Sequence, residues 1–407
     1  MKQSERLFFE LLQVAIDNRT SLSSTPTPEG WEEIQEICKK QTVVGIGFVG
    51  VKRLPEEQLP PRSRIRQWLV KVIKIEEKNK QVSSECQQVS ARFKHNGFYS
   101  CILKGQSLLK YYPEQLRMLR TPGDVDVWMR PNKKIREKFA DHRKSWIERF
   151  LLLDDFYTIG RYVKSVSRDM DDIVYHHFHC NILPKNMVEV HITPAFFMNP
   201  FKNRRLQRLF DDQWKLVQRE NSKDNDEGFY SMPIGINIIF LISHFYRHLI
   251  LEGIGMRQLM DICFAIKCFV DKCGSEDIRE EANVHCQLTS THRLMREIDR
   301  LGMHDITSGI MWMMRECLGM KEEYLLCTPS EKYGKHLLEE MMKGGNFGRS
   351  SKGAEEMYSG ETSAVRFWRS CKYGMRLMRY YPGETLWVPF NNAKQSIIKN
   401  YFRKHPL

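Results

Sequence analysis

The chain has 407 residues, of which 42% are hydrophobic and 28% are charged. This length and composition favour a globular protein of two or three domains and exclude a mostly disordered chain, a collagen-like fibre and a small disulfide-stapled scaffold. Its 63 Lys and Arg outnumber its 50 Asp and Glu, giving a net charge of +13. Such a charge indicates a polyanionic partner, such as a nucleotide, a nucleic acid or an anionic surface, without choosing among them.

Cysteine usage and hydropathy bear on the cellular compartment. The eleven cysteines are scattered and include no Cys-x-x-Cys pair, which is typical of reduced thiols, so we expect a cytoplasmic protein. Glu5 and Glu10 interrupt the apolar N-terminal stretch and argue against a signal peptide. No apolar run in the sequence approaches the ~20 residues that cross a bilayer, so we expect no transmembrane segment.

The first 95 residues are predicted to form a helical lead-in domain. Residues 1–20 and 32–40 have amphipathic spacing, and proline-containing loops flank the second of them. A long polar helix is predicted over 62–94, because Ile65 and Trp68 begin a series of apolar residues at the spacing of one helix face.

Between residue 96 and about 220 the pattern changes to short β-favouring runs mixed with helical segments. Strands are predicted at 98–105, 123–129, 173–183 and 187–193, and helical segments at 107–113 and 131–153. The last two strands lie close enough in sequence to form a hairpin around 184–186. The mixture predicts an α+β domain over 96–220.

After a polar linker at 221–228, helical patterns return. Helices are predicted at 233–251, 255–272, 288–300, 306–318 and 331–343, which together form a helical domain at 229–342. A glycine-rich linker at 343–362 then leads to a basic, aromatic segment at 363–407.

That C-terminal segment has nine Lys or Arg and one acid, Glu384. The cations are residues 366, 369, 372, 376, 379, 394, 399, 403 and 404. On the predicted helix at about 363–380 the basic residues share one side, and the other side carries Phe367, Trp368, Cys371, Met375 and Met378. We expect the apolar side to pack on the protein, and the basic side over 366–404 is a candidate for contact with RNA, DNA or another polyanion.

The richest chemistry lies between residues 103 and 129 and in a later strand. If 124–128 is a strand, Asp124 and Asp126 project from one face, where two close carboxylates repel each other unless a cation lies between them. In the strand 187–193, Glu189 and His191 also share a face. An adjacent pairing of these strands would bring Glu189 beside the two aspartates as a third acid, a donor set that suits a divalent metal such as Mg²⁺.

Phosphate-binding residues are predicted near the same strands. Lys104 and Gly105 end one strand and begin a helical turn, which places a cation and backbone N–H groups where a phosphate can dock. Arg120 lies four residues before Asp124 and is a second candidate for phosphate charge. Both cations have the alternative of ordinary surface ion pairs.

This constellation resembles a known family. The segments Leu103–Gly105, Tyr111–Pro113, Arg120-x-x-x-Asp124-x-Asp126 and Val188–His191 resemble the polymerase-beta-type nucleotidyltransferase superfamily, and more closely its largely uncharacterised bacterial branch, NTP-transferase type 5. The resemblance covers about 96–270, and 244–262 is similar to the branch's helical segment. The superfamily's adjacent Gly-Ser pair is separated here by Gln106.

The resemblance implies a small mixed-sheet nucleotidyltransferase core, flanked in this chain by helical N-terminal and C-terminal domains. It also implies two Mg²⁺ ions, for which Mn²⁺ can substitute, and transfer of a nucleoside monophosphate from an NTP such as ATP to a hydroxyl acceptor with release of pyrophosphate. The acceptor stays open among a small molecule, a sugar, RNA and a protein. Carried over by position, the implied metal ligands and catalytic acids are Asp124, Asp126 and Glu189. The implied triphosphate contacts are Gly105 and Ser107, beside Lys104 and Arg120, and the implied acceptor or supporting residues are His191, Arg257 and Asp261.

Three other interpretations remain open at this level. The first is a non-catalytic nucleic-acid or partner-binding protein on a degenerate version of the same fold, and the second is a metal-dependent phosphohydrolase. The third is a zinc site among His176, His177, His179 and His191, disfavoured because no cysteine or carboxylate has a diagnostic spacing to them. His244 and His248 share a helix face and are expected to be core or interface residues.

Overall fold

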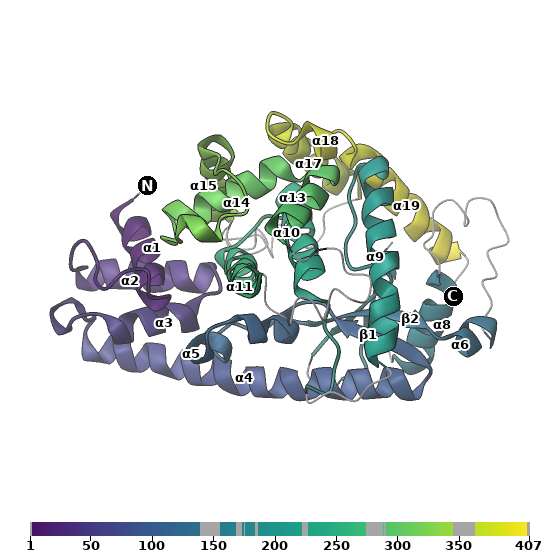
Figure 1. Ribbon diagram of the computed structural model, residues 1–407, viewed down its shortest axis with the longest axis horizontal. Coiled ribbons are helices and arrows are strands. Elements are labelled where there is room, and N and C mark those ends of the chain that lie inside the picture. Colours follow the sequence, from purple (N-terminus) through teal and green to yellow (C-terminus); the bar gives the residue numbers. More distant parts are fainter. Residues whose placement is uncertain are drawn as a thin grey trace.

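The computed structural model describes residues 2–138, 155–167, 173–174, 176–183, 186–221, 227–273, 288, 290–344 and 363–404 (Figure 1). Predicted features at 139–154, 184–185 and 345–362 lie outside these residues. The described chain combines a small sheet with many helices, as expected for an α+β protein.

The N-terminal part is helical, as predicted. Its helices are α1 (Gln3–Ala15), α2 (Pro28–Lys40), α3 (Val44–Arg53) and α4 (Arg62–His95). The 34-residue α4 runs along one long edge of the molecule, from the N-terminal helices to the sheet (Figure 1). Its buried Asn79 donates from Nδ2 to the carbonyl oxygens of Met118 and Arg120, both at 2.8 Å, and so fixes the loop that leads to the second strand.

Helix α3 is an element that the sequence analysis did not predict. Its sequence mixes valine and isoleucine with glycine, a composition that favours neither helix nor strand. The glycines have a packing reason: a Cβ atom at Gly45 would lie 2.3 Å from the carbonyl oxygen of Leu119, and one at Gly50 would lie 2.4 Å from that of Leu11. Close contact with neighbouring backbone therefore explains why glycine occupies both positions of α3.

The sheet has five strands in the order β1-β2-β5-β4-β3. The strands are β1 (Phe98–Ile102), β2 (Val125–Pro131), β3 (Ile173–Val174), β4 (His177–Cys180) and β5 (Val188–His191). β2 and β5 are parallel, and the other pairs are antiparallel, so the sheet is mixed. The predicted hairpin is confirmed as β4–β5. The prediction of one strand over 173–183 is wrong, because that run folds back on itself as the pair β3–β4.

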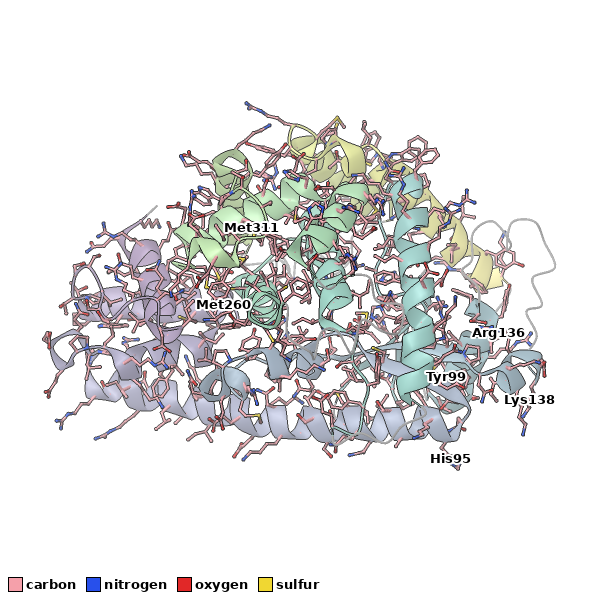
Figure 2. The ribbon with its side chains drawn as sticks, viewed as in Figure 1. His95, Tyr99, Arg136, Lys138, Met260 and Met311 are labelled. Carbon is pink, nitrogen blue, oxygen red and sulfur yellow. The ribbon has the colours of Figure 1, made fainter. Side chains whose placement is uncertain are left out.

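Short helical segments surround the sheet. They are the 3₁₀ helix η2 (Gly105–Tyr111), α5 (Glu114–Arg117), α6 (Lys133–Lys138), α8 (Phe156–Val166) and α9 (Pro200–Asn221). Figure 2 labels His95 at the end of α4 and Lys138 at the end of α6, both exposed at the sheet end of the molecule. Helix α9 contacts β1.

The second half of the chain is helical, as predicted. Its helices are α10 (Ile234–Leu251), α11 (Met256–Lys272), α13 (Thr291–Arg300), α14 (His304–Glu316), α15 (Glu331–Gly344), α17 (Ser363–Leu377), α18 (Pro382–Thr385) and α19 (Val388–Lys404). Met260 of α11 and Met311 of α14 lie fully buried between these helices (Figure 2). Among the described residues, α10 alone has the length and apolarity to cross a bilayer, and 89% of it is buried within the protein.

One hydrophobic cluster runs through the described chain from Leu7 to Phe402. It joins the N-terminal helices, both faces of the sheet and the C-terminal helices. The domain boundaries predicted from the sequence stay a prediction.

The packing of α17 differs from the expectation. Trp368 and Met375 were expected to face the protein, but they are 69% and 59% exposed. The helix packs on α10 and α19 instead, through the fully buried Leu377 and through the Tyr373 hydroxyl, which donates to the carbonyl oxygen of Leu249 at 2.9 Å. Contacts with these two helices therefore override the amphipathic pattern.

Candidate functional site

The two central strands of the sheet carry the predicted acids to one place. In the parallel register of β2 and β5, Asp126 lies opposite Glu189. His191 Nε2 lies 3.1 Å from Asp126 Oδ1 and 3.4 Å from Glu189 Oε2, so one imidazole bridges both carboxylates. The expectation that Glu189 lies beside Asp126 is confirmed, and the roles of both stay a prediction.

Asp124 lies one residue ahead of β2, so the predicted strand begins one or two residues too early. Its side chain is exposed, whereas Asp126 is only 2% exposed. Both aspartates line the same cavity. The pair therefore has a solvent-facing member and a buried member, which suits an ion that enters from the cavity.

Lys104 forms an ion pair with the buried carboxylate of Asp126. Its Nζ lies 3.1 Å from Asp126 Oδ1 and 3.4 Å from His244 Nε2. The lysine follows β1, and Gly105 then adopts a left-handed φ of +68° as η2 begins. The ammonium group of Lys104 thus contacts Asp126, a residue that is predicted to be a metal ligand.

Lys104, Asp124 and Asp126 line a cavity of about 520 Å³, a size in the usual range for small-molecule sites. Five of its side chains are cationic and three are acidic. The lining residues are Lys39, Lys40, Thr42, Lys104, Gly105, Arg120, Gly123, Asp124, Asp126, Leu241, His244, Arg257, Gln258 and Asp261. Such a cavity can hold an anion next to the carboxylates of Asp124 and Asp126.

The guanidinium of Arg120 forms an ion pair with a side chain of the same protein. Its Nε and Nη2 lie 2.7 Å from the two carboxylate oxygens of Asp261, and Tyr112 donates its hydroxyl to the same carboxylate at 2.6 Å. Burial lowers the pKa of Arg120, but the charge and hydrogen bonds of Asp261 together with Tyr112 raise it above its ordinary value. Arg120 therefore forms a buried ion pair on the cavity wall, and its expected phosphate contact stays a prediction.

Arg257 contributes a second guanidinium to the same wall. It donates from Nη1 to the carbonyl oxygen of Thr121 at 3.1 Å, and a Cβ atom at Gly123 would lie 3.6 Å from the same nitrogen. Burial, and then the charge of Arg120, lowers the pKa of Arg257 to about 10. An anion in the cavity would relieve this repulsion.

Ser107 is not brought to the cavity wall. It is 1% exposed, and its Oγ has no hydrogen-bond partner among the described residues. The preceding Gln106 points to α4, where its Nε2 donates to the carbonyl oxygen of Asn79 at 2.9 Å. The residue inserted between glycine and serine thus anchors η2 on α4, and Gly105 is left as the cavity-lining member of the motif.

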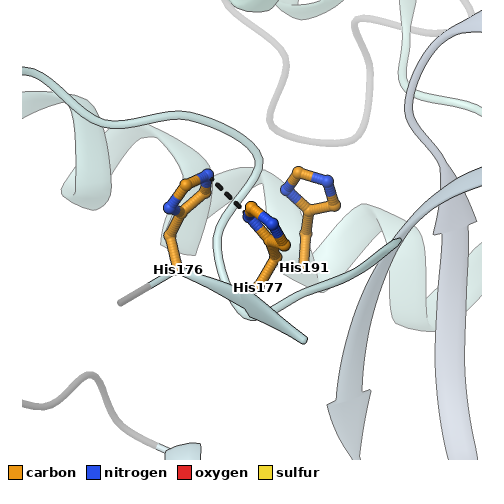
Figure 3. Close-up of side chains that lie close together, drawn as sticks. All are labelled: His176, His177 and His191. Atoms are coloured by element: carbon orange, nitrogen blue, oxygen red, sulfur yellow. Dashed lines mark hydrogen bonds between the residues drawn. The ribbon is translucent and has the colours of Figure 1, made fainter. Parts of the chain in front are cut away.

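Three histidines, His176, His177 and His191, lie close together near Glu189. His177 Nδ1 lies 2.9 Å from His176 Nε2, and the ring of His191 faces them (Figure 3). Burial, and then the neighbouring His191, lowers the pKa of His177 to about 2. Burial opposes ionisation of Glu189, but hydrogen bonds from His179 and His191 hold its pKa well below the ordinary value.

Several cavity residues had no signal in the sequence. Lys39, Lys40 and Thr42 come from α2 and the turn after it, far in sequence from the acids. His244 was interpreted as a core residue, yet it lines the cavity, and its ring contacts His248 at 2.9 Å. Only the packing of α2 and α10 beside the sheet reveals these residues.

The site thus combines a mixed sheet, with Asp126 and Glu189 on its central parallel strands, and a cationic cavity beside Asp126. A family model described as uncharacterised nucleotidyltransferase matches residues 27–298, more than half of the chain. The chain belongs to this family, as the sequence resemblance implied. No curated protein and no solved structure matches it. The match begins before α2 and so includes the helices that supply Lys39 and Lys40.

Proposed function

We propose that the protein transfers a nucleoside monophosphate from an NTP to a hydroxyl acceptor and releases pyrophosphate, with Mg²⁺ as its cofactor. The observation that carries this proposal is the parallel register of β2 and β5, which places Asp126 opposite Glu189 beside the cationic cavity. Membership of a nucleotidyltransferase family supports the reaction class.

The donor set fits the proposed cofactor. Asp124, Asp126 and Glu189 offer carboxylate oxygens, which Mg²⁺ prefers and which also suit Mn²⁺. We assign Asp124 and Asp126 to two ions and Glu189 to one of them. When bound, the ions neutralise charge that develops on the α-phosphate and on the leaving pyrophosphate.

The cations of the cavity bind the triphosphate in this proposal. Lys104 contacts Asp126 at 3.1 Å, so a divalent ion on that carboxylate would release the ammonium for a phosphate oxygen. Arg257, Lys39 and Lys40 lie on the same walls. Gly105 has open space where a Cβ atom would stand, which lets a phosphate approach its backbone.

Other residues position these groups. Arg120 and Asp261 join the loop before β2 to α11, and this contact orients the cavity wall. His191 holds Asp126 and Glu189 at a fixed separation. We assign to Glu189 the proton of the attacking hydroxyl, because its carboxylate lies opposite Asp126 and is partly exposed.

The test uses the full chain with each α-labelled NTP, Mg²⁺ or Mn²⁺, and cell extract as the source of acceptor. We expect one fraction to acquire label, with pyrophosphate as the second product. The double variant Asp124→Asn/Asp126→Asn should lose this labelling while it keeps its fold by circular dichroism. Asp299→Asn, an exposed carboxylate on α13, is the matched control and should label normally.

Two outcomes would reject the proposal. Labelling that persists in the double aspartate variant would separate the reaction from these acids. Release of free phosphate or nucleoside monophosphate, with no acceptor labelled, would indicate a phosphohydrolase instead.

A second candidate function, polyanion binding, is favoured by a groove between α9 and α13. Its volume is about 790 Å³, and six of its lining residues are basic against two acidic ones. The basic residues are Arg205, Arg208, Lys215, Arg293, Arg296 and Arg300, and the acids are Asp212 and Glu297. The groove and the basic segment 366–404 are both candidates to bind a nucleic-acid acceptor, or a nucleic acid without catalysis.

A further inference from the structure

The β4–β5 hairpin carries a second group of metal-binding side chain types. In its ladder, His177 lies opposite His191 and His179 lies opposite Glu189. Because side chains alternate along a strand, all four project from one face of the hairpin. None of the four is among the residues that line the cavity. The register thus supplies the carboxylate that sequence spacing alone could not assign to the histidines.

The distances among three of these side chains fit a transition-metal ion. His177 Nε2 lies 3.3 Å from His179 Nε2, and His179 Nε2 lies 3.7 Å from Glu189 Oε1. One donor atom from each residue lies within 4.8 Å of the other two. In a tetrahedral zinc site with bonds of about 2.0–2.1 Å, ligand atoms are about 3.3–3.4 Å apart. The Nε2 atoms of His177 and His179 therefore already lie at the separation expected for two ligands of one zinc ion.

A hydrogen-bond chain fixes the tautomer of His177. Arg247 Nη1 lies 3.3 Å from His176 Nε2, and a guanidinium can only donate, so His176 Nε2 is an acceptor. His177 Nδ1 lies 2.9 Å from the same nitrogen and must donate to it (Figure 3). The lone pair of His177 is then on Nε2, the nitrogen that faces His179. Metal-binding histidines are usually oriented in this way through their second nitrogen.

We propose that His177, His179 and Glu189 bind one zinc-class transition-metal ion through Nε2, Nε2 and Oε1. Two imidazoles with one carboxylate favour zinc over magnesium. Three protein ligands leave a fourth position open to water. The side chains of His179 and Glu189 are 30% and 25% exposed, so an ion can reach them from solvent.

Glu189 joins this site to the aspartates. Its Oε1 faces His179, whereas its Oε2 faces His191, which in turn contacts Asp126. The inference goes beyond the proposed nucleotide transfer and does not depend on it, because ion binding is measured without nucleotide.

The test uses the full chain, free of any histidine tag, stripped with a chelator and titrated with Co²⁺ as a spectroscopic substitute for Zn²⁺. We expect one Co²⁺ per chain, with the intense visible absorption of four-coordinate cobalt, displaced by Zn²⁺. His177→Ala and His179→Ala should each weaken binding by more than about 100-fold, since loss of even an outer hydrogen-bond partner costs about 10–100-fold.

Three further variants make the test specific. His179→Cys should restore binding and add a thiolate-to-cobalt charge-transfer band, which also excludes misfolding as the cause of the His179→Ala loss. His304→Ala, an exposed histidine on α14, should bind as the unaltered chain does. Asp126→Asn should keep the cobalt site.

The proposal is overturned if the unaltered chain binds no stoichiometric cobalt, or if His177→Ala and His179→Ala bind it normally. It is also overturned if Asp126→Asn abolishes binding while His179→Ala keeps it, because the ion would then lie among Asp126, Glu189 and His191. Loss of nucleotide transfer in the aspartate variants is a separate result.

Discussion

The guanidinium of Arg120 and the carboxylate of Asp261 form a buried, two-pronged ion pair, with both N–O distances at 2.7 Å. The pair connects the loop before β2 to α11, two segments that are 141 residues apart in the chain. Both side chains are about 95% buried, so water cannot solvate either charge if the pair is broken. The cavity wall therefore depends on a long-range contact.

We expect Asp261→Asn to lower the free energy of unfolding by about 3–5 kcal/mol, because it strands the buried charge of Arg120. Urea unfolding measures this change. The control is Glu339→Gln, which removes the carboxylate of an exposed pair with Lys343 and should cost less than about 1 kcal/mol. Equal effects of the two variants would contradict the assigned importance of the Arg120–Asp261 pair.

Gly105→Ala tests whether the backbone after β1 approaches a phosphate. The substitution forces alanine into a left-handed conformation and should cost about 1–2 kcal/mol. Gly319→Ala has the same backbone requirement, with φ of +64° and ordinary contacts for the new Cβ atom. We expect similar stability losses in both variants but a raised KM for NTP only in Gly105→Ala. Similar KM values in both would show that Gly105 does not contact the nucleotide.

Glu384 predicts a pH dependence of stability. This carboxyl is 2% exposed, and burial raises its pKa from 4.5 to about 7 despite Lys202 and the N–H groups of Met198 and Asn199. Between these pH values the folded chain holds a proton that the unfolded chain releases. The contribution of Glu384 to stability therefore falls as the pH rises from about 4.5 to about 7.

We expect Glu384→Gln to remove this fall, so that its stability relative to the unaltered chain rises with pH across the same window. The change should not exceed about 3.5 kcal/mol, from about 2.5 pKa units at about 1.4 kcal/mol each. Urea unfolding at about pH 5 and pH 8 measures it. A difference between the two proteins that stays constant with pH would show that Glu384 is ionised throughout.

The groove between α9 and α13 predicts salt-sensitive binding of nucleic acid. Arg208→Glu/Arg296→Glu should weaken binding of single-stranded RNA and reduce the slope of log affinity against log salt. Fluorescence anisotropy at several salt concentrations measures both. Lys133→Glu/Lys134→Glu is the charge-matched control on α6, outside the groove. If both double variants bind alike, the groove is not the binding surface.

Much of the site was predictable from local sequence. Period-two alternation identified β2 and β5, and the sequence predicted that Glu189 lies beside Asp126. The helices from α10 to α15 followed from apolar periodicity. These signals are local because side-chain direction within one element depends only on its own backbone.

The failures share a physical cause. Trp368 and Met375 were expected inside, but α17 packs on α10 and α19 with Leu377 buried and these two side chains exposed. For Arg120, the sequence did not indicate its ion-pair partner, which is Asp261 of α11. In each case a partner distant in sequence decided where the side chain lies.

The sequence by itself determined most of the strands and helices, with α3 and the β3–β4 pair as exceptions, and the strands that carry Asp126 and Glu189. Tertiary structure alone decided which of them meet: the pairing of β2 with β5, the arrival of Lys39 and Lys40 at the cavity, and the register that sets His179 against Glu189. The reason is that backbone propensity acts over a few residues, whereas burial, charge pairing and strand register are settled between segments that only the folded chain brings together.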